Sequence, residues 1–353
     1  VVHYNNGSGS FSGFTRLCNG TCNGESARLA DMGADGAVDL VAAVGNASMK
    51  NRIYNNEDGF DDARYTEVGS TTFTAHLEPA LLDSSGGYTE NYMDLVEGNW
   101  GPDVVFIYNP VSGAYEQRGD QLGNETTYYI YVADLLSGGA MCDGYPDVLA
   151  LYNGAVPSAR LYPGTESGAQ DAGSALEFGD RDYYSADAAE TDGDGMLELL
   201  LGSGTGESQH LFTRDDPADC SSSFIVSESI AEYSAQSIFA HLDSDGAPDI
   251  INSGPPTGAN DVWLNNAPAD SAPSTPAGVQ CSYAQDDSIE ISWNPATDPE
   301  TTDTALLTYS IYIKDFASGL YASSNTRDAG DGEYRMTKDN AGGVLEAVFD
   351  SLS

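Results

Sequence analysis

The stretch Glu190-Thr-Asp192-Gly-Asp194-Gly195-Met-Leu-Glu198 alternates oxygen-bearing side chains around glycines and runs directly into an apolar segment that ends at Leu201. A hard cation such as Ca²⁺ requires this chemistry, because several oxygens must converge on one small centre at a sharp turn. Four other acidic stretches with a glycine precede apolar runs in the same way: Asp31–Asp39, Asp94–Asp103, Asp134–Asp147 and His241–Asp249. Five copies in one chain indicate a repeat architecture.

The spacing of these stretches points to a fold class. The residues that close them are Asp39, Asp103, Asp147, Glu198 and Asp249. Their separations are 64, 44, 51 and 51 residues, which is the length of a four-stranded propeller blade. The apolar runs that follow are short and bounded by Gly, Asn and Pro, as buried strands are. Helical periodicity is nearly absent, so the sequence predicts an all-β fold.

A second motif follows the first apolar run at Ile53-Tyr-Asn-Asn-Glu-Asp-Gly59-Phe60 and suits a hairpin turn that needs positive φ. The chain also begins with such a motif, at Tyr4–Phe11. We therefore expect it to start inside a repeat, which upstream residues, another part of the ring or another molecule would complete. Tyrosines recur just after the strands and are predicted to pack between them: Tyr54, Tyr108, Tyr152 and Tyr162.

The composition and the apolar–polar pattern of the sequence change near residue 267. Residues 267–276 are rich in proline and read as a semi-rigid linker. Beyond it, Ser288–Trp293 and Leu307–Ile313 alternate apolar and polar residues, as strands half-buried in a β-sandwich do. We expect a repeat domain over 1–266 and a sandwich over 277–353, with Trp293 and Tyr309 in the sandwich core.

Charge limits the classes of partner. Thirteen basic residues against 55 acidic ones give a net charge of −42. Nucleic acids and anionic membranes need a basic face, so both are disfavoured as partners. No apolar run reaches the length of a membrane span. An excess of this size suits a salty or Ca²⁺-rich medium, in which self-repulsion is screened.

Two features favour a secreted or surface-displayed protein whose leader has been removed. The first is a set of acceptor sequons for N-glycosylation at Asn6, Asn19, Asn46 and Asn124. The second is Cys18 and Cys22, which flank a turn that could bring the two thiols together as a disulfide. Cys142 with Cys220 is a conceivable second bridge, and Cys281 is expected to be a buried thiol.

At this point the residues resemble a known family. The pattern D-x-D-x-D-G-x-x-D, followed by a strand and then by N-x-x-G-x-F, resembles the FG-GAP or VCBS repeat of integrin α-chain heads and secreted microbial surface proteins. The resemblance covers about residues 1–266 and implies a Ca²⁺-stabilised β-propeller. We expect about six blades, with seven as the alternative. Residues 277–353 resemble the start of a fibronectin type III-like sandwich.

The resemblance also implies a ligand set. In that family, loop positions one, three, five and nine bind Ca²⁺ through side chains, and position seven binds it through its carbonyl. The implied ligands are Asp31, Asp35, Asp39, Asp94, Glu97, Asn99, Asp103, Asp134, Asp143, Asp147, Glu190, Asp192, Asp194, the Met196 carbonyl, Glu198, Asp243, Asp245 and Asp249. The fourth stretch is the most complete. The alternative for any single stretch is an acidic β-turn without metal.

No catalytic motif is apparent. The chain has no H-E-x-x-H pattern, no G-x-S-x-G elbow and no P-loop lysine. The histidines, expected on the surface or in turns, are His3, His76, His210 and His241. We therefore expect a non-enzymatic, extracellular, calcium-stabilised scaffold for adhesion or assembly, including a fibre-forming subunit, that binds other copies of itself or extracellular protein or glycan partners. The alternative is a carbohydrate-binding or polysaccharide-degrading propeller, with exposed tyrosines and Trp100 as stacking platforms.

Overall fold

The computed structural model describes most of the chain. The residues outside its description are 6–9, 18–22, 34–37, 57–59, 83–91, 137–144, 156, 166, 169–175, 179–180, 193–196, 205–207, 216–223, 233–235, 244–246, 254–259, 266–272, 284–288, 298–312, 315–320, 324–345 and 350–353. The described residues form strands and connections and no helix, so the all-β prediction is confirmed. No helix that could cross a membrane occurs among them.

The strands, in chain order, are β1 (Val2–Asn5), β2 (Phe11–Thr15), β3 (Gly24–Ala30), β4 (Asp39–Val44), β5 (Asn51–Tyr54), β6 (Thr66–Val68), β7 (Thr74–Ala80), β8 (Asp94–Asn99), β9 (Asp103–Asn109), β10 (Ala114–Leu122), β11 (Thr127–Ala133), β12 (Asp147–Tyr152), β13 (Ala159–Tyr162), β14 (Leu176–Phe178), β15 (Tyr183–Ala189), β16 (Glu198–Ser203), β17 (Ser208–Arg214), β18 (Phe224–Glu232), β19 (Gln236–Ala240), β20 (Asp249–Ser253), β21 (Asp261–Trp263), β22 (Ala277–Tyr283), β23 (Ile289–Asn294), β24 (Ile313–Lys314), β25 (Tyr321–Ser323) and β26 (Glu346–Phe349).

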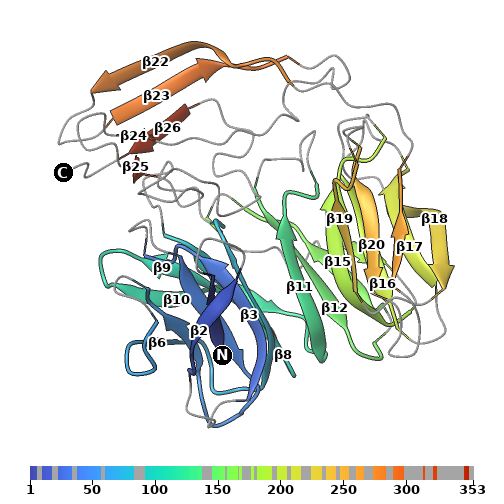
Figure 1. Ribbon diagram of the computed structural model, residues 1–353, viewed down its shortest axis with the longest axis horizontal. Helices are drawn as coiled ribbons and strands as arrows, with labels where there is room; N and C mark the ends of the chain where they lie inside the picture. The colour runs from blue at the N-terminus through green and yellow to red at the C-terminus, as the bar shows by residue number, and fades with distance from the viewer. Residues whose placement is uncertain are drawn as a thin grey trace.

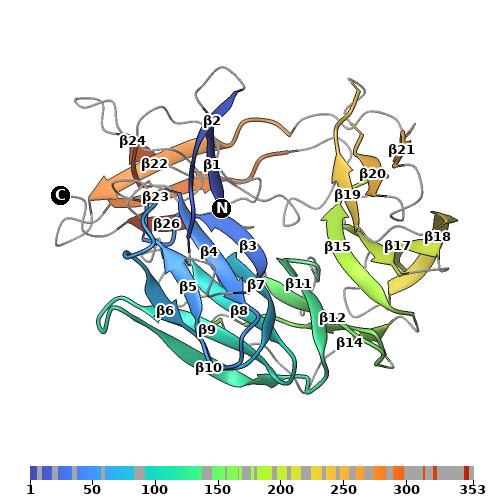
Figure 2. The same cartoon turned by 60° about the horizontal axis from the view of Figure 1, so that its bottom comes forward.

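Consecutive strands pair into separate antiparallel sheets. Among the described residues, four sheets have four strands each, in the orders β3 to β6, β7 to β10, β11 to β14 and β15 to β18. A three-stranded sheet, β19 to β21, follows them, and β1 pairs with β2. The first strands of consecutive sheets (β3, β7, β11, β15 and β19, here called the inner strands) pack against one another along this series. The sheets therefore stand side by side around a central space (Figures 1 and 2).

Both faces of a middle sheet are covered by its neighbours. On β12, Val148 and Ala150 pack toward the sheet β7 to β10. Leu149 and Leu151, which alternate with them, pack toward the sheet β15 to β18. Successive side chains of a strand point to opposite faces, so a strand that is covered on both sides becomes continuously apolar. This is why the sequence has short uninterrupted apolar runs.

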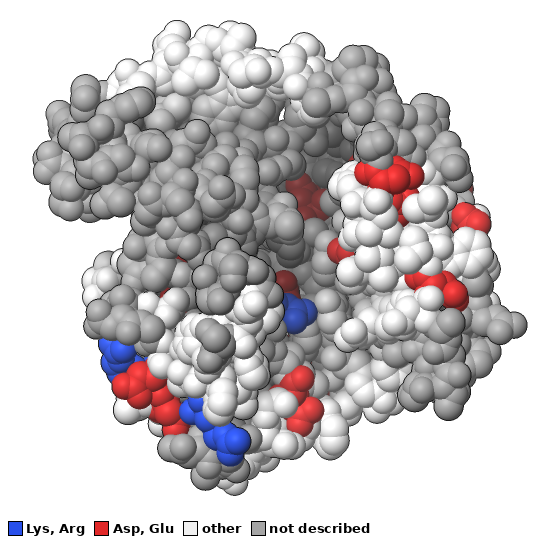
Figure 3. Space-filling view, in the orientation of Figure 1, with Lys and Arg blue, Asp and Glu red and all other residues white. Residues whose placement is uncertain are grey.

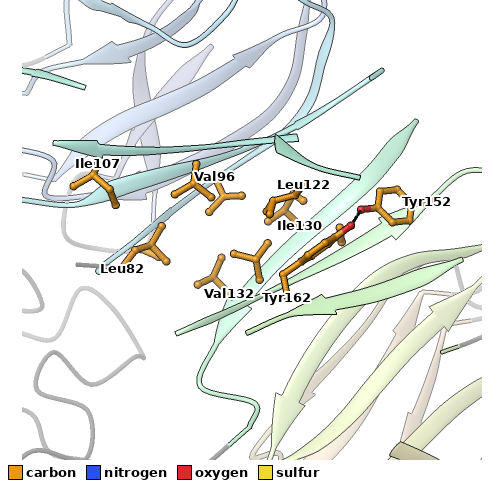
Figure 4. Close-up of a cluster of buried hydrophobic side chains, with 12 residues drawn as sticks. Leu82, Val96, Ile107, Leu122, Ile130, Val132, Tyr152 and Tyr162 are labelled. Carbon is orange, nitrogen blue, oxygen red and sulfur yellow. Dashed lines mark hydrogen bonds between the residues drawn. The ribbon is translucent and has the colours of Figure 1, made fainter. Parts of the chain in front are cut away.

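Figure 4 shows one of these inter-sheet cores, between the second and third four-stranded sheets. Tyr152 and Tyr162 lie in it with their hydroxyls 2.6 Å apart. Together with Tyr54 they are fully buried, which confirms their predicted packing role, whereas Tyr108 is half-buried. The buried members of the core are Ala80, Leu82, Val96, Val105, Ile107, Leu122, Ile130, Val132, Val148, Ala150, Tyr152 and Tyr162.

The inner strands have one edge with no strand beside it. Unpaired backbone amides at such an edge need other acceptors. Side chains from the preceding inner strand supply them. The bonds run from Leu77 N to Ser26 Oγ at 3.2 Å, from Ala188 N to the Tyr131 hydroxyl at 3.2 Å, from Ser237 N to Ser185 Oγ at 3.0 Å and from Phe239 N to Asp187 Oδ2 at 2.8 Å. Polar side chains thus join one sheet to the next at the centre.

The C-terminal part contains a separate sheet in the order β22, β23, β26. Trp293 on β23 is buried, as expected, whereas Tyr309 lies outside the described residues. Cys281 is a free and exposed thiol, so its expected burial is wrong. It lies on β22, whose residues from Ala277 to Ser282 are all exposed. Cys18, Cys22, Cys142 and Cys220 lie outside the described residues.

Candidate metal centre and the carboxylates around it

One carboxylate begins the second strand of each sheet in the series and accepts a hydrogen bond from the connection before that strand. Asp39, the first residue of β4, accepts hydrogen bonds from Met32 N at 3.1 Å and Asn56 N at 2.9 Å. Asp249, the first residue of β20, accepts them from Leu242 N at 2.8 Å and Asn265 N at 2.9 Å. In both sheets the side chain therefore ties the acidic loop before its strand to the backbone that follows the third strand.

The same arrangement recurs in the other sheets. Asp147 on β12 accepts hydrogen bonds from Leu135 N, Leu136 N and Gly164 N, each at 2.9 Å. Glu198 on β16 accepts one from Thr191 N at 2.7 Å. In every sheet the acidic residue pairs across the ladder with the alanine that ends the inner strand: Ala30, Ala80, Ala133, Ala189 and Ala240. We call Asp39, Asp94, Asp147, Glu198 and Asp249 the clamp carboxylates.

In the second sheet the clamp carboxylate is Asp94, which accepts hydrogen bonds from Leu82 N at 3.0 Å and Tyr108 N at 2.9 Å. The prediction that Asp103 closes an acidic loop over 94–103 is wrong, because Asp94–Asn99 forms strand β8. The clamp carboxylates are therefore separated by 55, 53, 51 and 51 residues, a more regular spacing than the sequence reading had.

Asp94 and Asp103 begin neighbouring antiparallel strands, so they lie at opposite ends of this strand pair. The ladder pairs Leu95 with Phe106 and Glu97 with Val104. Asp103 is therefore level with Gly98, about 13 Å along the strand from Asp94. Asp94 and Asp103 cannot ligate one ion, and the ligand set expected from this stretch, with Glu97 and Asn99, is not assembled.

The fourth stretch does bring its acids together. Glu190, Asp192 and Glu198 each offer a carboxylate oxygen, and these oxygens lie within 4.8 Å of one another. Asp192 is exposed, Glu190 is half-buried and Glu198 is buried at the start of β16. Asp192 N donates to Glu190 Oε1 at 3.0 Å, which curls the loop back on itself. Three carboxylates in this arrangement can hold a metal ion.

The remaining predicted ligands lie partly outside the described residues. Those outside are Asp35, Asp143, Asp194, Met196 and Asp245. Asp31 is buried beside the first clamp, Asp134 is half-buried and Asp243 is exposed. Burial raises the pKa of Asp147 to about 8, and the nearby charge of Asp134 adds to this rise. The third clamp therefore lies where added negative charge is unfavourable.

Two acids that the sequence assigned to a metal loop are instead wrapped by protein donors. Glu97 is fully buried and accepts hydrogen bonds from Asn51 Nδ2, Asn99 Nδ2 and both the amide and hydroxyl of Ser70. Burial raises the pKa of Glu97 to about 7, more than these donors lower it.

Asp103 is the second of these acids and is also fully buried. It accepts hydrogen bonds from Thr127 Oγ1 and from Asn99 N, each at 2.8 Å. Burial raises its pKa well above the ordinary value, and the charges of Glu125 and Glu97 raise it further. In the sequence these buried acids stand next to apolar residues, as the loop acids do.

A second polar group occupies the inner strands. Arg28 on β3 donates from Nε to Glu78 Oε2 on β7 at 2.7 Å and from Nη2 to the Tyr129 hydroxyl on β11 at 3.2 Å. Its Nη2 also lies 2.7 Å from His76 Nε2. Arg28 therefore contacts two further sheets, which is possible only because the inner strands converge. Figure 3 shows a hollow at the centre of the molecule with basic and acidic atoms in its wall.

His76 lies at the base of this group. It is buried in β7, and His210 is buried in β17, so the expectation of surface positions is wrong for both. Burial, and secondly the Arg28 charge, hold the pKa of His76 well below its ordinary value. On its other side the ring accepts a hydrogen bond at Nδ1 from Ile130 N at 3.3 Å, so His76 also binds an amide of the next inner strand, β11.

Two of the four predicted N-glycosylation sites lie among the described residues. Asn124 is exposed and Asn46 is half-buried, with its Oδ1 accepting from Ser48 N at 3.0 Å. Asn6 and Asn19 lie outside the described residues. An attached glycan needs an exposed amide nitrogen, and Asn124 meets this requirement best.

Comparison with known proteins gives only distant similarity. No family model and no curated protein matches the chain. Among solved structures, the PQQ domain of pyranose dehydrogenase from Coprinopsis cinerea has a TM-score of 0.35 and 10% identity over 94% of this chain and 83% of that one.

Two further solved structures are as distant. An engineered GH43 glycoside hydrolase has a TM-score of 0.34 and 9% identity over 77% and 62%. A Trichoderma reesei protein of Carbohydrate-Active Enzymes Family AA12, in a calcium structure, has 0.32 and 12% over 94% and 84%. Scores this low carry no argument about activity.

Proposed function

We propose that this protein is a calcium-stabilised β-propeller of about six blades, followed by a fibronectin type III-like sandwich, that acts outside the cell as a scaffold for adhesion or assembly. The observation that carries the proposal is the convergence of Glu190, Asp192 and Glu198 within 4.8 Å. Acidic stretches of the same form precede the clamps Asp39 and Asp249 in the sequence.

The role of the ion follows from electrostatics. Like-charged carboxylates at this separation repel one another, and a divalent cation offsets that repulsion. Its binding requires the folded loop, so it stabilises the native state by mass action, by about 2.7 kcal/mol when the free ion is at 100 times its dissociation constant. The ion holds the loop against the strand and performs no chemistry.

The experiment is a thermal unfolding series in Ca²⁺ and in chelator. The double variant Glu190→Gln/Asp192→Asn should lose a measurable part of the Ca²⁺-induced rise in Tm. The control is Glu228→Gln, which removes one charge from an exposed position on β18 of the same sheet. An identical Tm in Ca²⁺ and chelator for the unaltered protein would reject the structural ion.

An exposed apolar row supports the assembly role. Ile238, Ile251 and Val262 lie side by side across β19, β20 and β21, and Ile238 and Val262 are 49% and 58% exposed. In the first sheet the equivalent residues Val41 and Ile53 are buried against the next sheet. We propose that a second copy of the chain covers this exposed row. The two copies would meet head to tail, in a contact that does not close into a ring.

Light scattering over a concentration series tests the assembly. We expect large particles in Ca²⁺ that dissociate in chelator, and we expect Val262→Asp to abolish them. The control is Val111→Asp, an equally drastic change at a turn where the side chain is 95% exposed. A monomer at high protein and Ca²⁺ concentration, or particles unaffected by Val262→Asp, would contradict this assembly.

A further inference from the structure

At one structurally equivalent position, the chemical type of the side chain differs in nearly every repeat. It is the inner-strand residue that pairs with the third residue of the second strand. Its occupants are Arg28, Glu78, Tyr131, Asp187 and Ile238. Their partners on the second strand are uniformly apolar: Val41, Val96, Leu149, Leu200 and Ile251. A position that served packing alone would be apolar on both strands, because desolvating charge is costly.

Capping of the inner-strand amides accounts for only part of this set. Tyr131 and Asp187 accept hydrogen bonds from the next inner strand, so both have a structural role. Arg28 has no acceptor to offer, and its guanidinium instead spans three inner strands through Glu78 and Tyr129. The Arg28 and Glu78 side chains are 31% and 13% exposed, so part of each reaches solvent.

The geometry points to a binding site for a neutral carbohydrate at Arg28, Glu78 and Tyr129. This inference goes beyond the scaffold role and does not depend on calcium. Arg28 uses Nε, Nη2 and one Nη1 donor on described partners: Glu78, His76, Tyr129 and the Ala27 carbonyl at 3.2 Å. Nη1 of a guanidinium carries two N–H groups, so the second can bind a ligand oxygen.

The other members of the site complete a sugar-binding chemistry. The Tyr129 hydroxyl accepts from Arg28, which leaves its own hydrogen to be donated. Its ring lies 5.8 Å from the Arg28 guanidinium carbon and 4.3 Å from the His76 ring, so the phenol is held in place. Glu78 supplies a carboxylate beside these donors. Hydroxyl groups both donate and accept, so a polyol can use all three residues.

Charge selects a neutral ligand. The Arg28–Glu78 pair has no net charge, and the chain as a whole carries −42. The summed field repels anions. A sugar without a carboxylate therefore fits better than a uronic acid.

The test measures binding of glucose, galactose, mannose, xylose and their β-linked disaccharides by calorimetry and saturation-transfer NMR. Tyr129→Phe removes one oxygen, and Arg28→Lys keeps the charge but loses the fork of donors. Each should weaken the best sugar at least tenfold. Tyr128→Phe is the matched control, because Tyr128 precedes it on the same strand and stacks on Tyr184 at 4.7 Å; its affinity should equal that of the unaltered protein.

The outcomes are decisive because Tm is measured for each variant alongside binding. Weaker binding by a variant whose Tm is within a few degrees of the unaltered protein supports the site. Absence of binding by every sugar at millimolar concentration overturns the proposal. So does binding that is unchanged in Tyr129→Phe and Arg28→Lys, or a preference for glucuronate over glucose. Binding that is equal in Ca²⁺ and chelator would separate this site from the scaffold proposal.

Discussion

The second and fourth sheets place carboxylates in opposite kinds of surroundings. Glu97 and Asp103 in the second sheet are fully buried and enclosed by hydroxyl and amide donors. Glu190 and Asp192 in the fourth lie in a partly exposed loop where their oxygens converge with that of Glu198. A buried acid that protein donors already satisfy has no need of an ion, whereas converging acids at the surface can hold one. The residue type alone does not show to which of these two kinds of carboxylate an Asp or Glu belongs.

The clamp carboxylate Asp147 resembles the buried class, and Asp147→Ala should have the largest effect. It leaves Leu135 N, Leu136 N and Gly164 N without their acceptor. At about 1–3 kcal/mol for each unsatisfied buried group, we expect a loss of at least 3 kcal/mol in the free energy of unfolding, measured by urea denaturation.

This loss should be equal in Ca²⁺ and in chelator, because protein amides hold the clamp. Asp261→Ala, at an exposed position on β21, is the control and should change stability by less than about 0.5 kcal/mol. If the Asp147→Ala loss vanishes in chelator, the clamp is held mainly by an ion.

The buried acids predict a pH dependence. The pKa of Glu97 is about 7 in the folded protein against 4.5 for the ordinary value, so the folded state binds the proton more tightly than the unfolded state. The associated stabilisation is fully present below pH 4.5 and is lost as the pH rises through 7. At about 1.4 kcal/mol per pKa unit, the Glu97 share is at most about 3.5 kcal/mol.

The measurement is a urea midpoint series from pH 4.5 to 8. Asp103 interacts with Glu97 and its pKa is raised in the same direction, so the two titrate as a coupled pair. Glu97→Gln should flatten the profile between pH 5 and 7 without removing it. Its Ca²⁺ response should match that of the unaltered protein, and a weaker response would return Glu97 to the metal ligands.

A smaller effect is expected from Thr127→Val, which conserves shape and removes the hydroxyl that bonds both oxygens of Asp103 at 2.8 Å. A hydrogen bond to a charged group contributes about 1.5–3 kcal/mol. The loss should therefore be greatest at high pH, where Asp103 is ionised, and smaller at low pH. Chemical denaturation at the two extremes measures it, and an equal loss at both would mean that Asp103 does not ionise.

Much of the fold could be predicted from sequence, because its causes are local. Apolar runs such as Val148–Tyr152 require cover on both faces, and acidic turns mark where strands begin. The register of the second repeat could not be read from these signals, since both Asp94 and Asp103 precede apolar strands. The alanine that ends each inner strand, Ala80 in this repeat, was the signal that distinguishes them.

The grouping of Arg28, Glu78 and Tyr129 could not be predicted from the sequence, because it depends on contacts between distant parts of the chain. Arg28 and Tyr129 are about a hundred residues apart in the chain, on β3 and β11. No local pattern relates them, because their contact depends on the convergence of three inner strands. Glu97 was misassigned on similar grounds, since its partner Asn51 comes from the neighbouring sheet.

The smallest expected effect on stability is that of Glu190→Gln. It distinguishes metal-site carboxylates from carboxylates bound by protein donors most clearly, because the sign of the stability change depends on whether the ion is present. In Ca²⁺, Glu190→Gln removes a ligand and should lower Tm. In chelator, the same change removes one of three like charges within 4.8 Å, so it should raise stability by up to about 1 kcal/mol at low ionic strength. The amide oxygen of Gln can still accept from Asp192 N, which keeps the turn intact. An acidic turn without metal would show the gain under both conditions, and only a cation site reverses it.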